Sequence, residues 1–97
     1  MNKHATYGGA YVQEMLWDTL RKLDAEFEAA KKDPAFRAEF EDLLKNYAGR
    51  PTPLICAEHA TKELGGAKVY LKNEGANHTG AHKITHCLGQ GLLAKRL

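Results

Sequence analysis

One strand-like segment in a chain of helices and loops places the strongest constraint on the fold. The segment 67–72 (AKVYLK) combines a β-branched and an aromatic residue. Two glycines, 65–66, precede it, and a polar loop follows it. A single strand cannot bury a sheet face, and its backbone N–H and C=O groups need partner strands. Because we identify no second strand, we expect the chain to be part of a larger α/β fold.

Two helices are predicted in the first half of the chain. Apolar residues recur at helical spacing from Val12 to about Lys31, after a glycine-broken segment at 7–11. Asp33 and Pro34 then predict the start of a second helix, as its N-cap and its first helical residue. Gly49 is expected to end that helix as a left-handed cap.

The second half is predicted as a proline joint followed by helix, strand, loop and helix. The run 50–53 (RPTP) is excluded from helix interiors because proline lacks an N–H and biases the preceding residue toward extended backbone. We expect a short helix at 54–64, the strand at 67–72, a Gly/Asn/Thr/His loop at 73–81, and a last helix from about His82. One side of that helix is expected to carry Ile84, Cys87, Leu88, Gly91 and Leu92.

These elements divide the chain into a helical lead-in, 1–53, and a helix–strand–loop–helix region, 54–97. No glycine or proline stop follows the last helix, which is still running at Leu97. We therefore expect the sequence to stop inside a larger fold; the family resemblance given below implies that residues 1–97 are a partial N-terminal region of a larger two-domain chain.

Composition excludes several classes of protein. The net charge of +2 is too weak to indicate nucleic-acid binding. No apolar run approaches the ~18 residues of a membrane helix, and the N-terminus has no apolar signal core, so we expect a cytoplasmic protein. Two cysteines do not make a disulfide scaffold. A chain of 97 residues supports one modest core, which argues against a complete enzyme with an enclosed site.

The strand–loop–helix run 70–90 is where chemistry is expected. Ligands gather at the carboxyl ends of strands in open α/β sheets, and a helix N-terminus presents free N–H groups to anions. Lys83 is predicted in the first turn of the last helix, where a cation is locally unfavourable. It is either a solvated lysine or one whose unprotonated amine forms a Schiff base, and the residues alone leave both interpretations open.

Three histidines raise a metal-site alternative. His78, His82 and His86 recur every four residues, and Cys87 follows. On one continuous helix they would form a plausible zinc or nickel site. Gly80 argues against such a helix, so no metal ligand is assigned, although a site split between loop and helix stays open. The simpler interpretations are a partly buried or surface His86 and a core Cys87.

Two glycine patterns do not complete nucleotide-binding motifs. Gly75 and Gly80 have the spacing of a phosphate loop, but residues 81–82 (AH) stand where Lys and Ser or Thr are required. The run 89–91 (GQG) lies inside a predicted helix, where close helix packing is the expected role.

Two long runs resemble a known family. The runs 44–54 (LKNYAGRPTPL) and 77–84 (NHTGAHKI), followed by 88–90 (LGQ) and 93–96 (LAKR), resemble the tryptophan synthase β-chain family of type II pyridoxal-phosphate enzymes. Gly8-Gly9 with Tyr11-Val12, and Asp33-Pro34, resemble the N-terminal region of that family. The similarity is collinear over nearly the whole chain.

The resemblance implies a fold, a cofactor and a reaction. The fold is the type II pyridoxal-phosphate α/β fold, mostly helical in this segment. Lys83 corresponds to the lysine that holds pyridoxal 5′-phosphate and moves the substrate Cα proton, and His82 would lie near the cofactor phosphate. As a lyase of this family, the full chain would form L-tryptophan from L-serine and indole. Its partners would be an α chain that supplies indole and a second β chain in a homodimer.

The sequence departs from the family pattern beside the cofactor lysine. The run 72–76 reads KNEGA where the family usually has Lys-Arg-Glu-Asp-Leu, and Thr85 stands where it usually has Asn. Asn73, Gly75, Ala76 and Thr85 therefore leave room for an altered substrate preference. The family's catalytic glutamate, phosphate loop and pyridine-nitrogen partner are expected beyond Leu97, so the isolated chain is expected to be inactive. The alternatives are a stand-alone helical assembly module and a metal-binding module.

Overall fold

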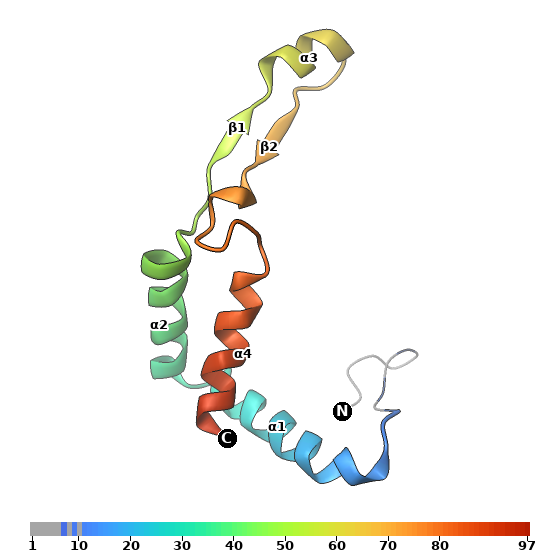
Figure 1. Ribbon diagram of the computed structural model, residues 1–97, viewed down its shortest axis with the longest axis vertical. Coiled ribbons are helices and arrows are strands. Elements are labelled where there is room, and N and C mark those ends of the chain that lie inside the picture. Colours follow the sequence, from blue (N-terminus) through green and yellow to red (C-terminus); the bar gives the residue numbers. More distant parts are fainter. Residues whose placement is uncertain (1–6, 8, 10) are drawn as a thin grey trace.

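The computed structural model describes residues 7, 9 and 11–97, which form a helical body and a long, thin arm (Figure 1). The predicted segment at 7–11 and the pair Gly8-Gly9 lie partly outside the described residues. The elements are the 3₁₀ turn η1 (Glu14–Leu16), α1 (Trp17–Ala30), α2 (Pro34–Asp42), the π-helical η2 (Leu43–Ala48), β1 (Leu54–Cys56), α3 (Glu58–Leu64), β2 (Tyr70–Lys72), the 3₁₀ turn η3 (Glu74–Ala76) and α4 (Ile84–Arg96).

The first two helices form largely as the sequence predicts. The first begins with η1 at Glu14, two residues later than expected, and ends at Ala30. Asp33 is confirmed as the N-cap of α2, because its Oδ1 accepts a hydrogen bond from the Ala35 N–H at 2.9 Å. Pro34 is confirmed at the start of α2.

The end of the second helix is a π-helical turn, which the sequence analysis did not predict. Over η2 the chain makes a wider turn, and the Leu44 carbonyl accepts the N–H groups of both Gly49 and Arg50. Gly49 has φ +86°, which confirms it as the left-handed cap. The chain therefore leaves the helix sharply into the proline joint at 50–53.

The prediction of a helix over 54–64 is wrong in its first part. Leu54–Cys56 forms β1, and the helix α3 begins at Glu58. Proline biases the residue before it toward extended backbone, and the joint at 50–53 carries the chain extended into Leu54. The branched side chain of Ile55 also suits a strand better than a helix.

The expectation of a strand without a partner is also wrong. β1 pairs antiparallel with β2, with Leu54 opposite Lys72 and Cys56 opposite Tyr70. The pairing extends past both strands, because Ala57 N–H donates to the Val69 carbonyl at 2.9 Å. The predicted strand at 67–72 is confirmed in its second half. The two strands and α3 together make the arm (Figure 1).

The helical body packs α4 beside α2, and the C-terminal part of α1 contacts α4 (Figure 1). Its apolar core is small. The apolar side chains that are buried among the described residues are Ala30, Ala48, Ile84 and Leu92. At the far end of α4, Arg96 forms 2.6 Å ion pairs with Glu26 of α1 and with Asp33.

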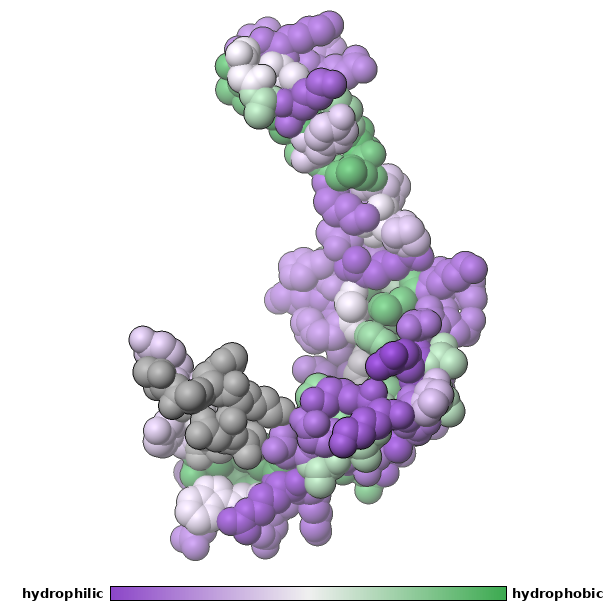
Figure 2. Space-filling view, turned by 180° about the vertical axis from the view of Figure 1, so that it is seen from behind, coloured by the Kyte–Doolittle hydropathy of each residue, from purple (hydrophilic) through white to green (hydrophobic). Residues whose placement is uncertain are grey.

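The molecule is elongated. Its radius of gyration is 18.9 Å, whereas a compact domain of about 100 residues has about 13 Å. Apolar side chains remain exposed along the arm, as Figure 2 shows, and Leu54 and Leu71 keep 65% and 56% of their surface. None of the helices within the described ranges is long and apolar enough to cross a bilayer.

Candidate functional site

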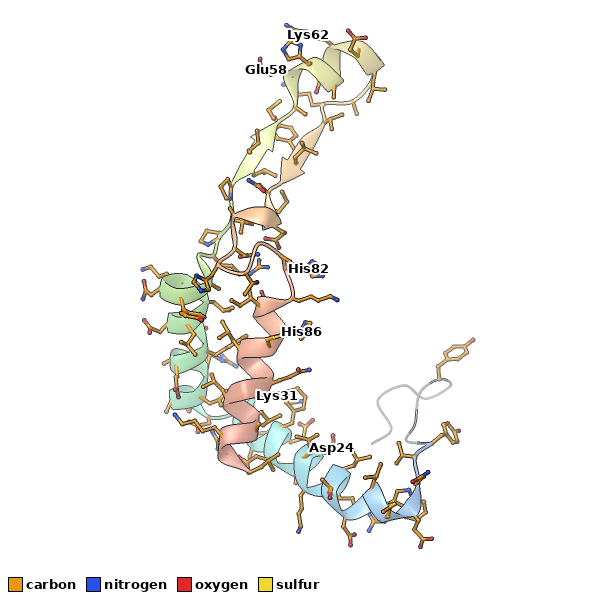
Figure 3. The ribbon with its side chains drawn as sticks, in the orientation of Figure 1. Asp24, Lys31, Glu58, Lys62, His82 and His86 are labelled. Carbon is orange, nitrogen blue, oxygen red and sulfur yellow. The ribbon has the colours of Figure 1, made fainter. Side chains whose placement is uncertain are left out.

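Lys83 lies at the junction between the polar loop and α4. It is the N-cap residue of α4, one position before the first turn in which the sequence analysis placed it. Its side chain is exposed, and its ammonium group has no hydrogen bond or ion pair within the part of the chain that the structure describes. His82 is exposed beside it, at the end of the loop (Figure 3). The amine is therefore accessible to a reacting carbonyl compound.

The loop before Lys83 is tied to the helical body at defined points. The His78 N–H donates to the Ala48 carbonyl at 3.0 Å, and the His78 ring lies 4.7 Å from the Tyr47 ring, centroid to centroid. Gly80 turns the loop with φ +74°, and its N–H donates to the Asn77 carbonyl at 2.8 Å. These bonds connect the end of η2 to the start of α4.

Arg50 links the proline joint, the loop and α4. Its Nε donates to Thr85 Oγ1, and its Nη2 donates to Glu74 Oε1, both at 2.7 Å. The second carboxylate oxygen of Glu74 accepts hydrogen bonds from Thr52 Oγ1 at 2.7 Å and from Asn77 Nδ2 at 3.2 Å. We call these five residues the Arg50 network.

The charge of Glu74 is stabilised by these partners. The hydrogen bond from Thr52 is the largest cause that lowers the pKa of Glu74 below its ordinary 4.5, followed by the hydrogen bond from Arg50. Partial burial works in the opposite direction. The Arg50 and Glu74 side chains are 24% and 30% exposed, so the pair is sheltered from solvent without being fully buried. The carboxylate is ionised at neutral pH.

Asn77 is the most buried polar residue of the loop, with 4% of its surface exposed. Its Nδ2 donates to the carbonyl and to the carboxylate of Glu74. Its Oδ1 is buried and has no hydrogen-bond partner within the described residues. Such an acceptor is costly unless a donor satisfies it.

The metal-site alternative is not supported in the described part of the chain. No three His, Cys, Asp or Glu side chains there lie close enough together to hold a metal ion, so His78, His82 and His86 are not brought together. His86 is exposed, which agrees with the simpler interpretation of a surface residue (Figure 3). The interpretation of Cys87 as a core residue is wrong, because Cys87 is exposed.

The face of α4 is narrower than the sequence analysis expected. Ile84 and Leu92 are buried and Leu88 is half-buried, whereas Cys87 and Gly91 face outward. Close helix packing is confirmed at Gly89, whose added Cβ would lie 3.4 Å from the Phe40 ring.

The site residues fit an aldehyde cofactor at the attachment point. An exposed lysine amine at a helix start, without a hydrogen bond or ion pair to the described residues, can condense with an aldehyde, and the adjacent helix N-terminus favours a phosphate. A cavity of about 560 Å³ lies elsewhere, between α1 and the far end of α4. It is lined mainly by apolar side chains, among them Leu23, Phe27 and Leu93. Lys83 thus offers attachment without lining that cavity.

The sequence analysis missed the Arg50 network. Arg50 and Thr52 were assigned only to the proline joint, and Glu74 only to the loop. The available signal was a glutamate flanked by polar loop residues and an arginine beside two prolines. Neither indicates a partner across 24 or 35 residues of chain.

Comparison with known proteins confirms the family resemblance. No protein-family model matches the chain. The chain is 55% identical over 91 residues to the tryptophan synthase beta chains of Allorhizobium ampelinum and of a Ruegeria species. The match covers 94% of this chain and 22% of each relative, so the chain spans about a fifth of their length.

Proposed function

We propose that this chain is an N-terminal segment of a tryptophan synthase β chain, a pyridoxal-phosphate-dependent lyase. The supporting observation is the 55% identity over 91 residues, which leaves only six residues of the chain unmatched. The whole protein would form L-tryptophan from L-serine and indole by replacing the serine hydroxyl. It would adopt the type II pyridoxal-phosphate α/β fold.

Lys83 and His82 are the residues that we assign to the cofactor. Lys83 would hold the cofactor covalently through Nζ and would move the Cα proton of the substrate. His82 and the N-terminus of α4 would face the phosphate, since helix N–H groups and a neighbouring imidazole suit an anion. When bound, pyridoxal phosphate supplies an electron sink for the departure of the serine hydroxyl.

The proposal also covers the partners of the whole protein and its location in the cell. The whole protein would act in the cytoplasm, as a homodimer of β chains with an α chain that supplies indole. The exposed apolar side chains of the arm agree with packing against further protein surface.

The 97-residue chain by itself is expected to produce little or no tryptophan. The described residues offer the attachment amine, but Lys83 does not line the apolar cavity between α1 and α4. The test is tryptophan formation by the purified chain with pyridoxal phosphate, L-serine and indole. Robust turnover would contradict this part of the proposal.

The attachment role of Lys83 is tested by trapping. The chain is incubated with pyridoxal phosphate and reduced with borohydride, and the labelled lysines are mapped by mass spectrometry. We expect Lys83 to label faster than the other lysines, and Lys83→Ala to remove that fast label. Lys95→Ala is the matched control, because Lys95 is another exposed lysine of α4. A fast label that persists in Lys83→Ala would assign the attachment to another residue.

A further inference from the structure

We propose that Arg50 is a positioning residue for Lys83. Its guanidinium holds the first turn of α4 against the proline joint and the loop, so that the Lys83 amine is presented to an incoming aldehyde from one fixed place. The proposal rests on the function proposed above, in which Lys83 is the attachment residue.

The start of α4 has no local side-chain cap. α4 begins without a side-chain hydrogen bond from its own N-cap residue, Lys83. Within the described residues, the side-chain hydrogen bond made to its first turn comes from Arg50, which donates to Thr85 Oγ1 at 2.7 Å. Thr85 lies two residues after Lys83, in the same turn. The start of α4 is therefore held by a residue 35 positions earlier in the chain.

Arg50 is itself fixed by hydrogen bonds of its backbone and its side chain. Its backbone N–H donates to the Leu44 carbonyl at 2.9 Å, so the residue is fastened to the end of η2. Its Nη2 bonds Glu74, whose other oxygen is occupied by Thr52 and Asn77. A planar guanidinium that donates to two partners has little rotational freedom. The orientation of Thr85 is thereby fixed relative to the joint and the loop.

The loop before Lys83 is joined to the same network through Asn77. Asn77 is buried and bonds Glu74 twice, and the next residue, His78, bonds the Ala48 carbonyl. Lys83 thus follows a loop anchored through Glu74 and precedes a helical turn anchored through Arg50. Both anchors meet at the Arg50–Glu74 ion pair.

The experiment compares the labelling rates of two lysines in one molecule. The 97-residue chain is labelled with pyridoxal phosphate and borohydride, and the ratio of Lys83 to Lys95 labelling is measured. Thr85→Val replaces the hydroxyl by a methyl group of similar size, and we expect it to lower the ratio about fivefold, the effect of one lost hydrogen bond. Thr85→Ser keeps the acceptor and should preserve the ratio.

Two further variants separate positioning from general stability. Arg50→Lys keeps the charge beside Glu74 but cannot donate as a fork, so it should resemble Thr85→Val. Arg21→Gln removes an exposed arginine of α1 that forms an ion pair with Asp18 at 3.6 Å and lies over the Trp17 ring, far from Lys83 in the sequence, and it should leave the ratio unchanged. A loss of fold would also bring the two labelling rates together, so the circular dichroism of each variant is recorded. A lowered ratio at an unchanged spectrum supports positioning, whereas a ratio that falls only together with the helical signal contradicts it.

The outcomes distinguish this proposal from the proposed function. If Lys83 labels no faster than Lys95 in the unmodified chain, the attachment role fails, and amide hydrogen exchange over residues 84–87 then decides whether Arg50 holds the turn. Faster exchange in Thr85→Val, restored in Thr85→Ser, supports the anchor. An unchanged Lys83-to-Lys95 ratio in Thr85→Val, with Lys83 labelling fast, overturns the positioning role. If Lys83 does not label fast, unchanged amide hydrogen exchange over residues 84–87 in Thr85→Val overturns the positioning role as well.

Discussion

At the residue scale, the positions that match the family pattern differ from those that depart from it in their hydrogen bonds and exposure. Within the run 72–76, Lys72 and Glu74 match the pattern, and both side chains make hydrogen bonds: Lys72 Nζ donates to the Thr52 carbonyl at 2.7 Å, and Glu74 accepts from three residues. Asn73, Gly75 and Ala76 depart from the pattern and are exposed. Thr85 departs as well, yet it keeps an acceptor for Arg50, as an asparagine would.

Glu74 should make the stability of the folded chain decrease at acidic pH. Its folded-state pKa lies below the ordinary 4.5, so the ionised carboxylate stabilises the fold at neutral pH. That contribution is lost as the pH falls from about 4.5 through the lower folded-state value. Glu74→Gln should therefore be less stable than the unmodified chain at pH 7, with a smaller loss of stability on acidification. Urea midpoints followed by circular dichroism across this range provide the measurement.

The control for that prediction is Glu63→Gln, which changes an exposed glutamate of α3. Asp33 contributes to the remaining pH dependence, because its hydrogen bond from Arg96 is the largest cause that lowers its pKa. The dependence of stability on pH should therefore be weaker in Glu74→Gln than in the unmodified chain, but it should not disappear. Identical pH profiles for the unmodified chain and for Glu74→Gln would contradict the expectation.

At the element scale, helices were predicted well where a terminal residue acts locally. Asp33, Pro34 and Gly49 are found in their predicted roles at the ends of the second helix. β1 was missed because a three-residue strand carries little pattern of its own and forms by pairing with β2. The apolar side of α4 was also predicted too wide. Cys87 and Gly91 were expected on it but are exposed, since α2 covers only part of the helix surface.

Two glycines of α4 provide a test of which helix face is packed. An added Cβ at Gly91 would meet nothing within 4 Å, so Gly91→Ala should stabilise the chain by about 1 kcal/mol through helix propensity. At Gly89 the same Cβ would lie 3.4 Å from Phe40, so Gly89→Ala should gain less. Urea unfolding of both variants measures the difference. An equal gain for the two would contradict the expectation that the Phe40 ring restricts a side chain at position 89.

At the scale of the whole molecule, the chain exposes more surface than a compact protein of its size. Its accessible area is 7809 Å², whereas a compact monomer of this mass has about 5,500 Å². Tyr70 and Leu71 of the arm remain largely exposed, and the cavity between α1 and α4 has an apolar lining. Such surfaces are typical of protein that packs against further protein.

The isolated chain should therefore unfold over a broad range of urea with a small slope, because unfolding exposes little additional surface. It should also bind the dye ANS at neutral pH and self-associate with rising concentration. Circular dichroism, dye fluorescence and light scattering measure these properties. A sharp cooperative transition of a monomer without dye binding would contradict the expectation, and it would favour the stand-alone helical module.

The position of Lys83 in the candidate site could be predicted from the sequence, but the long-range hydrogen bonds of the Arg50 network could not. Lys83 could be placed near a helix start because Gly80 and the polar run before it break any helix there. The turn at Gly80 rules out a continuous helix through the three histidines, and the described residues do not bring them together as a site split between loop and helix either. Arg50 could not be connected to Thr85, because the joint and the arm bring together residues that are 35 positions apart.

The sequence by itself determined the start and the left-handed cap of the second helix, the place of Lys83 at the loop–helix junction and the family resemblance. Each of these depends on residues within a few positions of one another, through hydrogen bonds of caps and turns or through contiguous motifs. Only the tertiary structure decided the pairing of β1 with β2 and the Arg50 network. Both depend on groups that are distant in sequence, which meet only after the chain has closed the intervening loops.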